Sequence, residues 1–143
     1  MTILPSSPAA ILVIDGHDED REYWVDRLNL WACEYIVLQA HNGATGLALC
    51  QSRQIDCVVV DIDLPDMSGF EVLVKLVPRA RHPEVAVIML SRTYLLPMAE
   101  LARKNGAQEC LFKSHTTGDQ LVAAIRKGIA VVGPRKDRQG LTP

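Results

Sequence analysis

The stretch Cys57-Val-Val-Val-Asp61 is apolar and rich in β-branched residues until its last position, which carries a carboxylate. Short apolar runs of this kind are typical of strands that are buried on both faces of a parallel sheet. The next segment, Leu64-Pro-Asp-Met-Ser-Gly69, contains the proline and glycine that end regular structure. The pattern therefore predicts a buried strand over residues 57–61, with Asp61 at its carboxyl end and a loop after it.

Strand patterns alternate with helix patterns along the rest of the chain. Further strands are predicted at residues 10–15, 35–38, 85–90 and 110–112. Apolar residues at helical spacing follow each strand, and Asp18 is expected to cap the first helix. Gly106 is expected directly after the fourth helix. Five strands that each precede a helix predict an α/β fold, a doubly wound parallel sheet with helices on both faces.

Some apolar residues have a predicted place in this fold. Trp24, Trp31 and Phe70 recur at helical spacing and are expected to pack against the fold rather than to contact a cofactor. The apolar stretch 94–98 is expected to fold inward, with a partner-binding surface as the alternative.

Composition is typical of a single globular domain. The chain has 143 residues, 48% hydrophobic and 22% charged, with a formal net charge of −2. This charge gives no basic field that would attract nucleic acid. The chain also lacks a run of about 18 apolar residues, the length needed to span a membrane. The start of the chain lacks the positive region of a signal peptide. We expect a cytoplasmic protein with an N-terminal extension over residues 1–9, one domain over 10–131 and a C-terminal tail over 132–143.

Cysteines and histidines show no spacing typical of metal sites. Cys50 and Cys57 lie in apolar contexts and are expected to be buried free thiols, as in a reducing compartment. The 4 histidines lack the local spacing of zinc ligands, so we do not expect them to bind metal. The sequence therefore predicts neither a disulfide framework nor a zinc site.

Polar side chains end or follow four of the predicted strands: Asp15, Asp61, Ser91 and Lys113. In sheets of this class, ligands bind beyond the carboxyl ends of the strands. Two carboxylates there suit Mg²⁺, which takes oxygen ligands and commonly bridges to phosphate. A hydroxyl and a lysine can bind phosphoryl oxygens, and an aspartate is a competent nucleophile for phosphorus. The set predicts a phosphoryl-accepting site that uses Mg²⁺.

The chain resembles the receiver domain of two-component response regulators over about residues 10–130. The resemblance rests on segments 11–15, 58–61, 64–70, 87–91 and 111–113, taken in order. It implies a three-layer flavodoxin-like (βα)5 fold with strand order 2-1-3-4-5. It also implies that Asp61 is the phosphoacceptor, Ser91 the switch hydroxyl and Lys113 the phosphate-binding lysine. Mg²⁺ would be held by Asp15, Asp61 and the backbone carbonyl of Asp63.

The resemblance implies a signalling function rather than an enzyme. A histidine kinase or phosphotransfer protein would phosphorylate Asp61, and the added charge would draw Ser91 and Lys113 inward. The face of the fourth helix, fifth strand and fifth helix would then regulate a downstream effector protein or a fused signalling module. The same face is a candidate homodimer surface. No direct nucleic-acid or membrane partner is expected.

Three positions depart from the receiver pattern. The second acid expected after the first strand is Gly16, which leaves the Mg²⁺ site one carboxylate short. Asp18, or the side chain of Asp63, could compensate through water. Cys110 replaces the switch aromatic, and Ser114 replaces the proline after the lysine. A peptide bond before serine is expected to be trans, which puts the position of the preceding lysine in question.

Two alternatives stay open at this point. Gly16, Cys110 and Ser114 favour a pseudo-receiver, a non-phosphorylated protein-interaction module with the same fold. The segment 61–63, with the later serine and lysine, mimics in order three motifs of haloacid-dehalogenase-type phosphohydrolases. However, two strand–helix units precede Asp61, and no acidic pair on a further strand follows Lys113. Mg²⁺ affinity would test the first alternative, and turnover of a phosphate ester would test the second.

Overall fold

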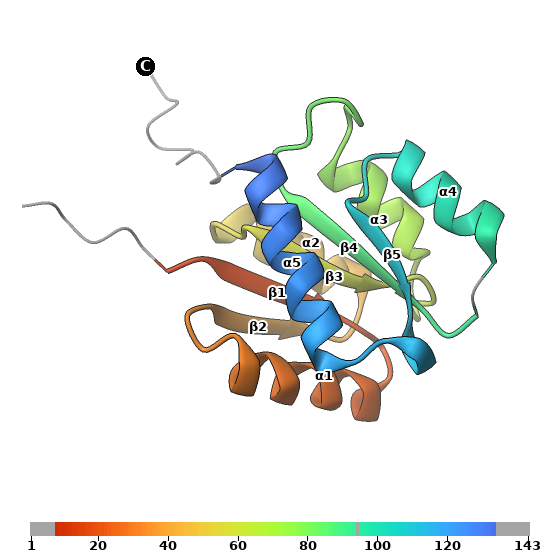
Figure 1. Cartoon of the computed structure of the whole chain (residues 1–143). Coiled ribbons are helices and arrows are strands. Elements are labelled where there is room, and N and C mark those ends of the chain that lie inside the picture. Colours follow the sequence, from red (N-terminus) through yellow and green to blue (C-terminus); the bar gives the residue numbers. More distant parts are fainter. Residues whose placement is uncertain (1–7, 94, 134–143) are drawn as a thin grey trace, which may run out of the picture.

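The computed structural model describes residues 8–93 and 95–133 of the chain (Figure 1). Its centre is a 5-stranded parallel sheet with the order β2-β1-β3-β4-β5, as the resemblance implied. The strands are β1 (Ala10–Ile14), β2 (Ile36–Ala40), β3 (Cys57–Asp61), β4 (Ala86–Ser91) and β5 (Glu109–Phe112). The helices are α1 (Asp18–Trp31), α2 (Gly43–Ser52), α3 (Gly69–Leu76), α4 (Leu96–Lys104) and α5 (Gly118–Val132), with a short 3₁₀ turn η1 (Lys113–His115) before α5.

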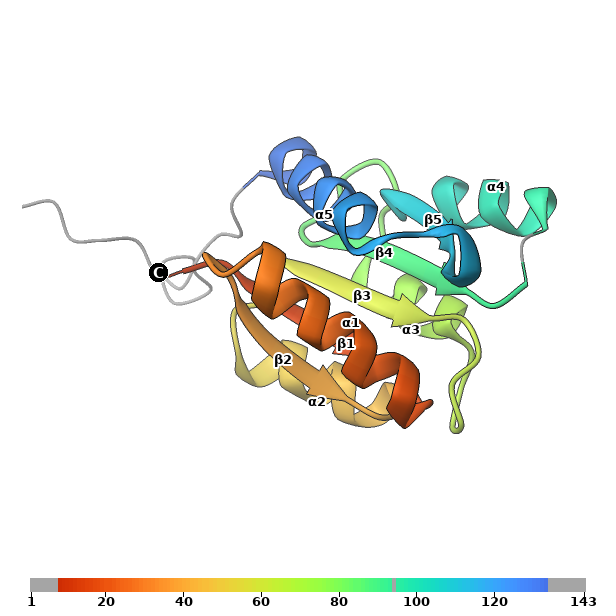
Figure 2. The ribbon, with the colours of Figure 1, turned by 60° about the horizontal axis from the view of Figure 1, so that its bottom comes forward.

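Helices cover both faces of the sheet, so the fold has three layers (Figure 2). Successive side chains of a strand point to opposite faces. Accordingly, Ile11 and Val13 pack with α1 and α5, whereas Leu12 and Ile14 pack with α2, α3 and α4. This burial on both sides explains why β1 is apolar throughout and β3 is apolar up to its last residue, Asp61.

The predicted elements are present, with shifted boundaries. The second strand, predicted at residues 35–38, is Ile36–Ala40. The expectation that Asp18 caps α1 is wrong, because α1 begins at Asp18 and His17 takes the cap position without a side-chain cap bond. Gly106 follows α4 with a positive φ of 102°, which confirms its predicted place.

Most of the predicted burial is confirmed. Cys50 and Cys57 are buried free thiols, and Trp24, which lies on α1, is buried. Trp31 is a correction, because it lies at the end of α1 and is 56% exposed. Within the stretch 94–98, Leu95 and Leu96 are exposed rather than folded inward, and residue 94 lies outside the described residues.

Residues 1–7 of the expected N-terminal extension and 134–143 of the expected tail also lie outside the described residues. In the described part of the chain, no helix combines the length and apolar character needed to cross a membrane.

Candidate functional site

The site lies at the carboxyl edge of the sheet, where β1 and β3 run side by side. Asp15 directly follows β1, and Asp61 is the last residue of β3. Because the strands are parallel, their final residues meet at one edge. Both carboxylates are taken out of water, since Asp15 is 1% exposed and Asp61 is 0% exposed. Two buried acids require a cationic partner close by.

Lys113 provides this cation, although it lies 98 positions after Asp15 and 52 positions after Asp61 in the sequence. Its Nζ donates to Oδ2 of Asp61 at 2.7 Å, Oδ2 of Asp15 at 2.8 Å and Oδ2 of Asp20 at 2.9 Å. The side chain is only 7% exposed. Lys113 starts the η1 turn immediately after β5, and the described residues contain no cis peptide bond. Ser114 therefore does not prevent the lysine from reaching Asp61.

The electrostatics of the cluster follow from this contact. Burial by itself would lower the pKa of Lys113, but hydrogen bonds to the three carboxylates outweigh it and raise that pKa. For Asp15 burial prevails, and its pKa is raised despite the ammonium group. Asp20 is less buried, so Lys113 and Arg92 outweigh its desolvation and lower its pKa. Of these two acids, Asp20 therefore favours the ionised form more strongly than Asp15 does.

Sequence reasoning did not single out His17 or Asp20, and the structure places both in the site. Nδ1 of His17 lies 3.3 Å from Oδ1 of Asp15 and 3.2 Å from Oδ2 of Asp61. Asp20, in the first turn of α1, joins Lys113 to Arg92, whose guanidinium donates to the same Oδ2 at 3.0 Å. One signal was available, because a residue in the first turn of a helix leans back toward its N-terminal end.

The other predicted site residues are arranged differently. The side chain of Asp18 is 77% exposed and pairs with Arg21 at 2.8 Å. Ser91 ends β4 and is buried, but its hydroxyl donates to the carbonyl of Thr93 rather than to Asp61. The backbone N–H of Asp63 donates to Oδ1 of Asp61 at 3.0 Å, which fixes the orientation of the Asp61 carboxylate.

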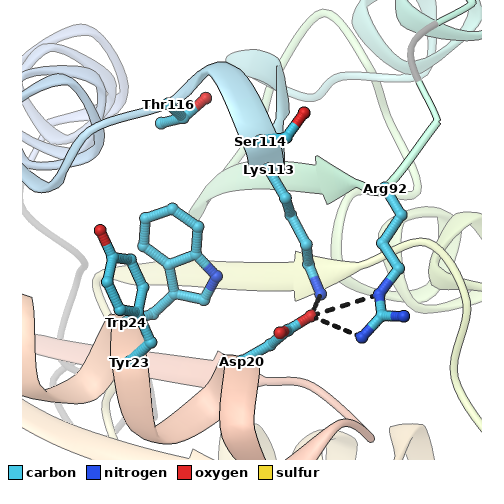
Figure 3. A pocket seen from close by; sticks show the side chains of 7 residues that line it. All are labelled: Asp20, Tyr23, Trp24, Arg92, Lys113, Ser114 and Thr116. Atoms are coloured by element: carbon cyan, nitrogen blue, oxygen red, sulfur yellow. Dashed lines mark hydrogen bonds and ion pairs between the residues drawn. The ribbon is translucent and has the colours of Figure 1, made fainter.

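A cavity opens beside Lys113, between α1 and the segment that follows β5 (Figure 3). Its volume is about 480 Å³. Lys113, Arg92 and Asp20 line one side of the cavity, and Tyr23 and Trp24 line the other side (Figure 3). An ionic group and a buried indole thus share one cavity, so tryptophan fluorescence can report on events at the site.

The residues present fit a divalent cation. One ligand atom from each of Asp15, His17 and Asp20 lies within 4.8 Å of the other two. Carboxylate oxygens are the ligands that Mg²⁺ prefers, and imidazole nitrogen is a common ligand of transition-metal ions. Mg²⁺ at this position would neutralise charge on the phosphoryl group and its acceptor.

Cys110, the departure at the position of the switch aromatic, lies in the core. Cys110 is 5% exposed on β5, and burial raises the pKa of its thiol. A small thiol in this position cannot swing between a buried and an exposed state as an aromatic ring can. If a movement of Ser91 is transmitted to β5, side chains other than that of Cys110 must transmit it.

Buried acids, a lysine and a hydroxyl thus lie at the carboxyl ends of the strands, where sheets of this flavodoxin-like class bind their ligands. The chain matches the response regulator receiver domain over residues 11–126 and belongs to that family. The two-component response regulator ARR15 of Arabidopsis thaliana is 27% identical over an alignment of 121 residues, and the match covers 76% of this chain and 57% of that protein. The nitrate/nitrite response regulator protein NarL of Escherichia coli K12 is 29% identical over 136 residues, 95% of this chain and 61% of that protein.

Solved structures agree with this assignment. The crystal structure of a response regulator receiver domain protein from Clostridium thermocellum is 32% identical, with a TM-score of 0.73. The match covers 86% of this chain and 95% of that one. By contrast, the chain spans about three fifths of the length of the two curated relatives above. Receiver domains are signalling domains of two-component systems, and this chain is one of them.

Proposed function

We propose that Asp61 accepts a phosphoryl group from a histidine kinase or phosphotransfer protein, in a reaction that requires Mg²⁺. The observation that carries the proposal is the contact of Lys113 Nζ with Oδ2 of Asp61 at 2.7 Å, inside a buried site. In transfer from a phosphohistidine, an Asp61 oxygen forms the new P–O bond, the P–N bond breaks, and the imidazole leaves with the electron pair and takes a proton from water.

Lys113 has a second role in this proposal. Before phosphorylation its ammonium group pairs with Asp15 and Asp61, and afterwards it binds a phosphoryl oxygen. Ser91 must give up its bond to Thr93 in order to reach the phosphoryl group. Both movements act at the ends of β4 and β5, so the face of α4, β5 and α5 changes.

This α4-β5-α5 face is the proposed output surface. It would bind a downstream effector protein or a fused signalling module, and it is a candidate homodimer surface. Leu96 and Leu101 on α4 are 54% and 50% exposed, so apolar contact area is available there. We propose a cytoplasmic location and the domain boundaries 10–131, and no direct binding of nucleic acid or membrane.

The test combines Mg²⁺ titration with a small phosphodonor. Acetyl phosphate is added to the full chain with and without Mg²⁺, and intact mass is recorded. One added phosphoryl group that requires Mg²⁺ and is absent in Asp61→Asn supports the proposal. A folded wild-type protein that gains no phosphoryl group, and shows no fluorescence response to beryllofluoride, contradicts it.

A pseudo-receiver is the second candidate, and one observation favours it. Every oxygen of the Asp61 carboxylate already has a partner, since Oδ1 accepts from Asp63 and Oδ2 contacts Lys113 and His17. A carboxylate whose two oxygens are both occupied in this way could hold the fold together without phosphorylation. Absence of both Mg²⁺ binding and phosphoryl uptake would favour this candidate. The phosphohydrolase alternative gains no support, because the family match is to receiver domains.

A further inference from the structure

Position 16 has no room for the carboxylate that receivers usually carry there. A Cβ atom at Gly16 would lie 2.7 Å from Cδ of Pro65 and 3.4 Å from the carbonyl oxygen of His41. The proline ring is rigid, so the loop after β3 would have to move to admit any side chain. The acid at this position is therefore replaced by packing of the Pro65 loop, and another residue must supply its charge.

Asp20 has the position and the charge to do so. Its side chain is 29% exposed and reaches from α1 toward Lys113 and Arg92 (Figure 3). Among the described residues, the bonds to Asp20 fall on Oδ2, which leaves Oδ1 for a cation. In octahedral Mg²⁺ coordination adjacent ligands lie about 3 Å apart and opposite ligands about 4.2 Å apart. The three ligand atoms, which lie within 4.8 Å of one another, must therefore approach one another by up to about 2 Å to bind one ion.

The charge balance leaves space for a divalent ion. Asp15, Asp20 and Asp61 contribute −3, and Lys113 and Arg92 contribute +2, which gives −1 with His17 neutral. A divalent cation changes this sum to +1, and a positive site favours an incoming phosphoryl group. Without Asp20 the cluster would be neutral before the cation binds.

We propose that Asp20 is the carboxylate ligand that replaces the missing acid of position 16, and that Asp15, His17 and Asp20 form the cation site next to Asp61. This inference rests on the proposed function, because it concerns the Mg²⁺ that phosphorylation of Asp61 requires. It differs from the expectation for Asp18, whose exposed carboxylate is paired with Arg21.

The experiment measures binding of Mg²⁺ and Mn²⁺ to the full chain. With Trp31→Phe in the background, Trp24 becomes the single tryptophan, and its fluorescence is followed during a Mg²⁺ titration. Bound Mn²⁺ is counted independently by the loss of the electron paramagnetic resonance signal of the free ion. The variants are Asp20→Asn, Asp20→Ala, Asp18→Asn, Asp15→Asn and Glu19→Gln, each checked for folding by circular dichroism.

Asp20→Asn and Asp20→Ala each remove a ligand, so each should lower the affinity for Mg²⁺ and for Mn²⁺ by at least about tenfold. Glu19→Gln removes one charge from the same exposed helical turn and should change affinity by roughly twofold or less, because exposed charges are screened. Alanine is included because asparagine retains a carbonyl oxygen that can still bind a cation.

Two outcomes overturn the inference in distinguishable ways. If Asp15→Asn loses the cation while both Asp20 variants bind as wild type does, the site is real but Asp20 is not a ligand, and the proposed function is unaffected. Loss in Asp18→Asn alone has the same consequence and assigns the role to Asp18. If the wild type binds neither ion, the Mg²⁺ dependence of the proposed function fails together with this inference.

Discussion

Replacing Lys113 by methionine should destabilise the protein strongly near neutral pH. The substitution keeps a long, apolar side chain but removes the ammonium group that contacts three carboxylates at 2.7–2.9 Å. Each contact corresponds to a Coulomb attraction of about 6 kcal/mol at an effective dielectric constant of about 20, most of which offsets desolvation. Removal of one partner of a buried ion pair typically costs about 3–5 kcal/mol, and we expect a loss in this range.

The loss should depend on pH in a definite direction. Without the ammonium group, burial raises the pKa of Asp15 further above its ordinary value. A carboxyl whose pKa is raised in the folded state favours the protonated form, so the variant becomes relatively more stable as the pH falls. The difference between wild type and variant should therefore be largest near pH 7 and smaller near pH 5.

Urea unfolding followed by tryptophan fluorescence measures this difference at both pH values. Lys127→Met is the matched control, because Lys127 is exposed on α5. It should change the free energy of unfolding by no more than about 0.5 kcal/mol. A loss of less than about 1 kcal/mol in Lys113→Met, or a larger loss that is the same at pH 5 and pH 7, would refute the reasoning.

Three further predictions concern stability and use the same unfolding assay. Thr117→Ala removes the capping box of α5 and should cost about 0.5–2 kcal/mol, whereas no loss would contradict the observed cap. Leu28→Ala should cost about 2–5 kcal/mol because Leu28 is 0% exposed, and Leu30→Ala, at 69% exposed, should cost far less. Two backbone N–H groups at the start of α2 lower the pKa of Asp66, so its stabilisation is present above its ordinary pKa near 4 and is lost as the pH falls through the lowered value. Asp66→Ala should therefore reduce stability at pH 7 more than at pH 3, and an equal reduction at both would contradict this origin.

The fold was predictable because the strands are buried on both faces. Continuous apolar runs such as residues 57–61 are hard to place in any other class of sheet, and a helix pattern follows each of them. The meeting of Asp15, Asp61 and Lys113 was predictable for the same reason, because parallel strands bring their carboxyl ends to one edge.

The rest of the site depends on local geometry that the sequence pattern does not specify. Asp18 and Asp20 are equally plausible acids in the sequence, but the start of α1 at Asp18 turns one toward Arg21 and the other toward Lys113. His17 joins the site because only Gly16 separates it from Asp15. The packing of Pro65 against Gly16 joins residues about fifty positions apart, and only the folded chain reveals it.

The helix surface was also less predictable than the core. Trp31 continues the apolar spacing of Trp24 and Leu28, yet it lies where α1 ends and the sheet no longer covers it. Helical periodicity indicates which side of a helix is apolar, but not how far along the helix the neighbouring layer extends.

The most direct test of the central claim is chemical mapping of the phosphorylated residue. The full chain is treated with acetyl phosphate and Mg²⁺ and then with borohydride, which reduces an aspartyl phosphate to homoserine, and the position of homoserine is found by peptide mass spectrometry. The account predicts homoserine at position 61, dependent on Mg²⁺. Homoserine at another aspartate, or at none in a folded sample, would contradict it.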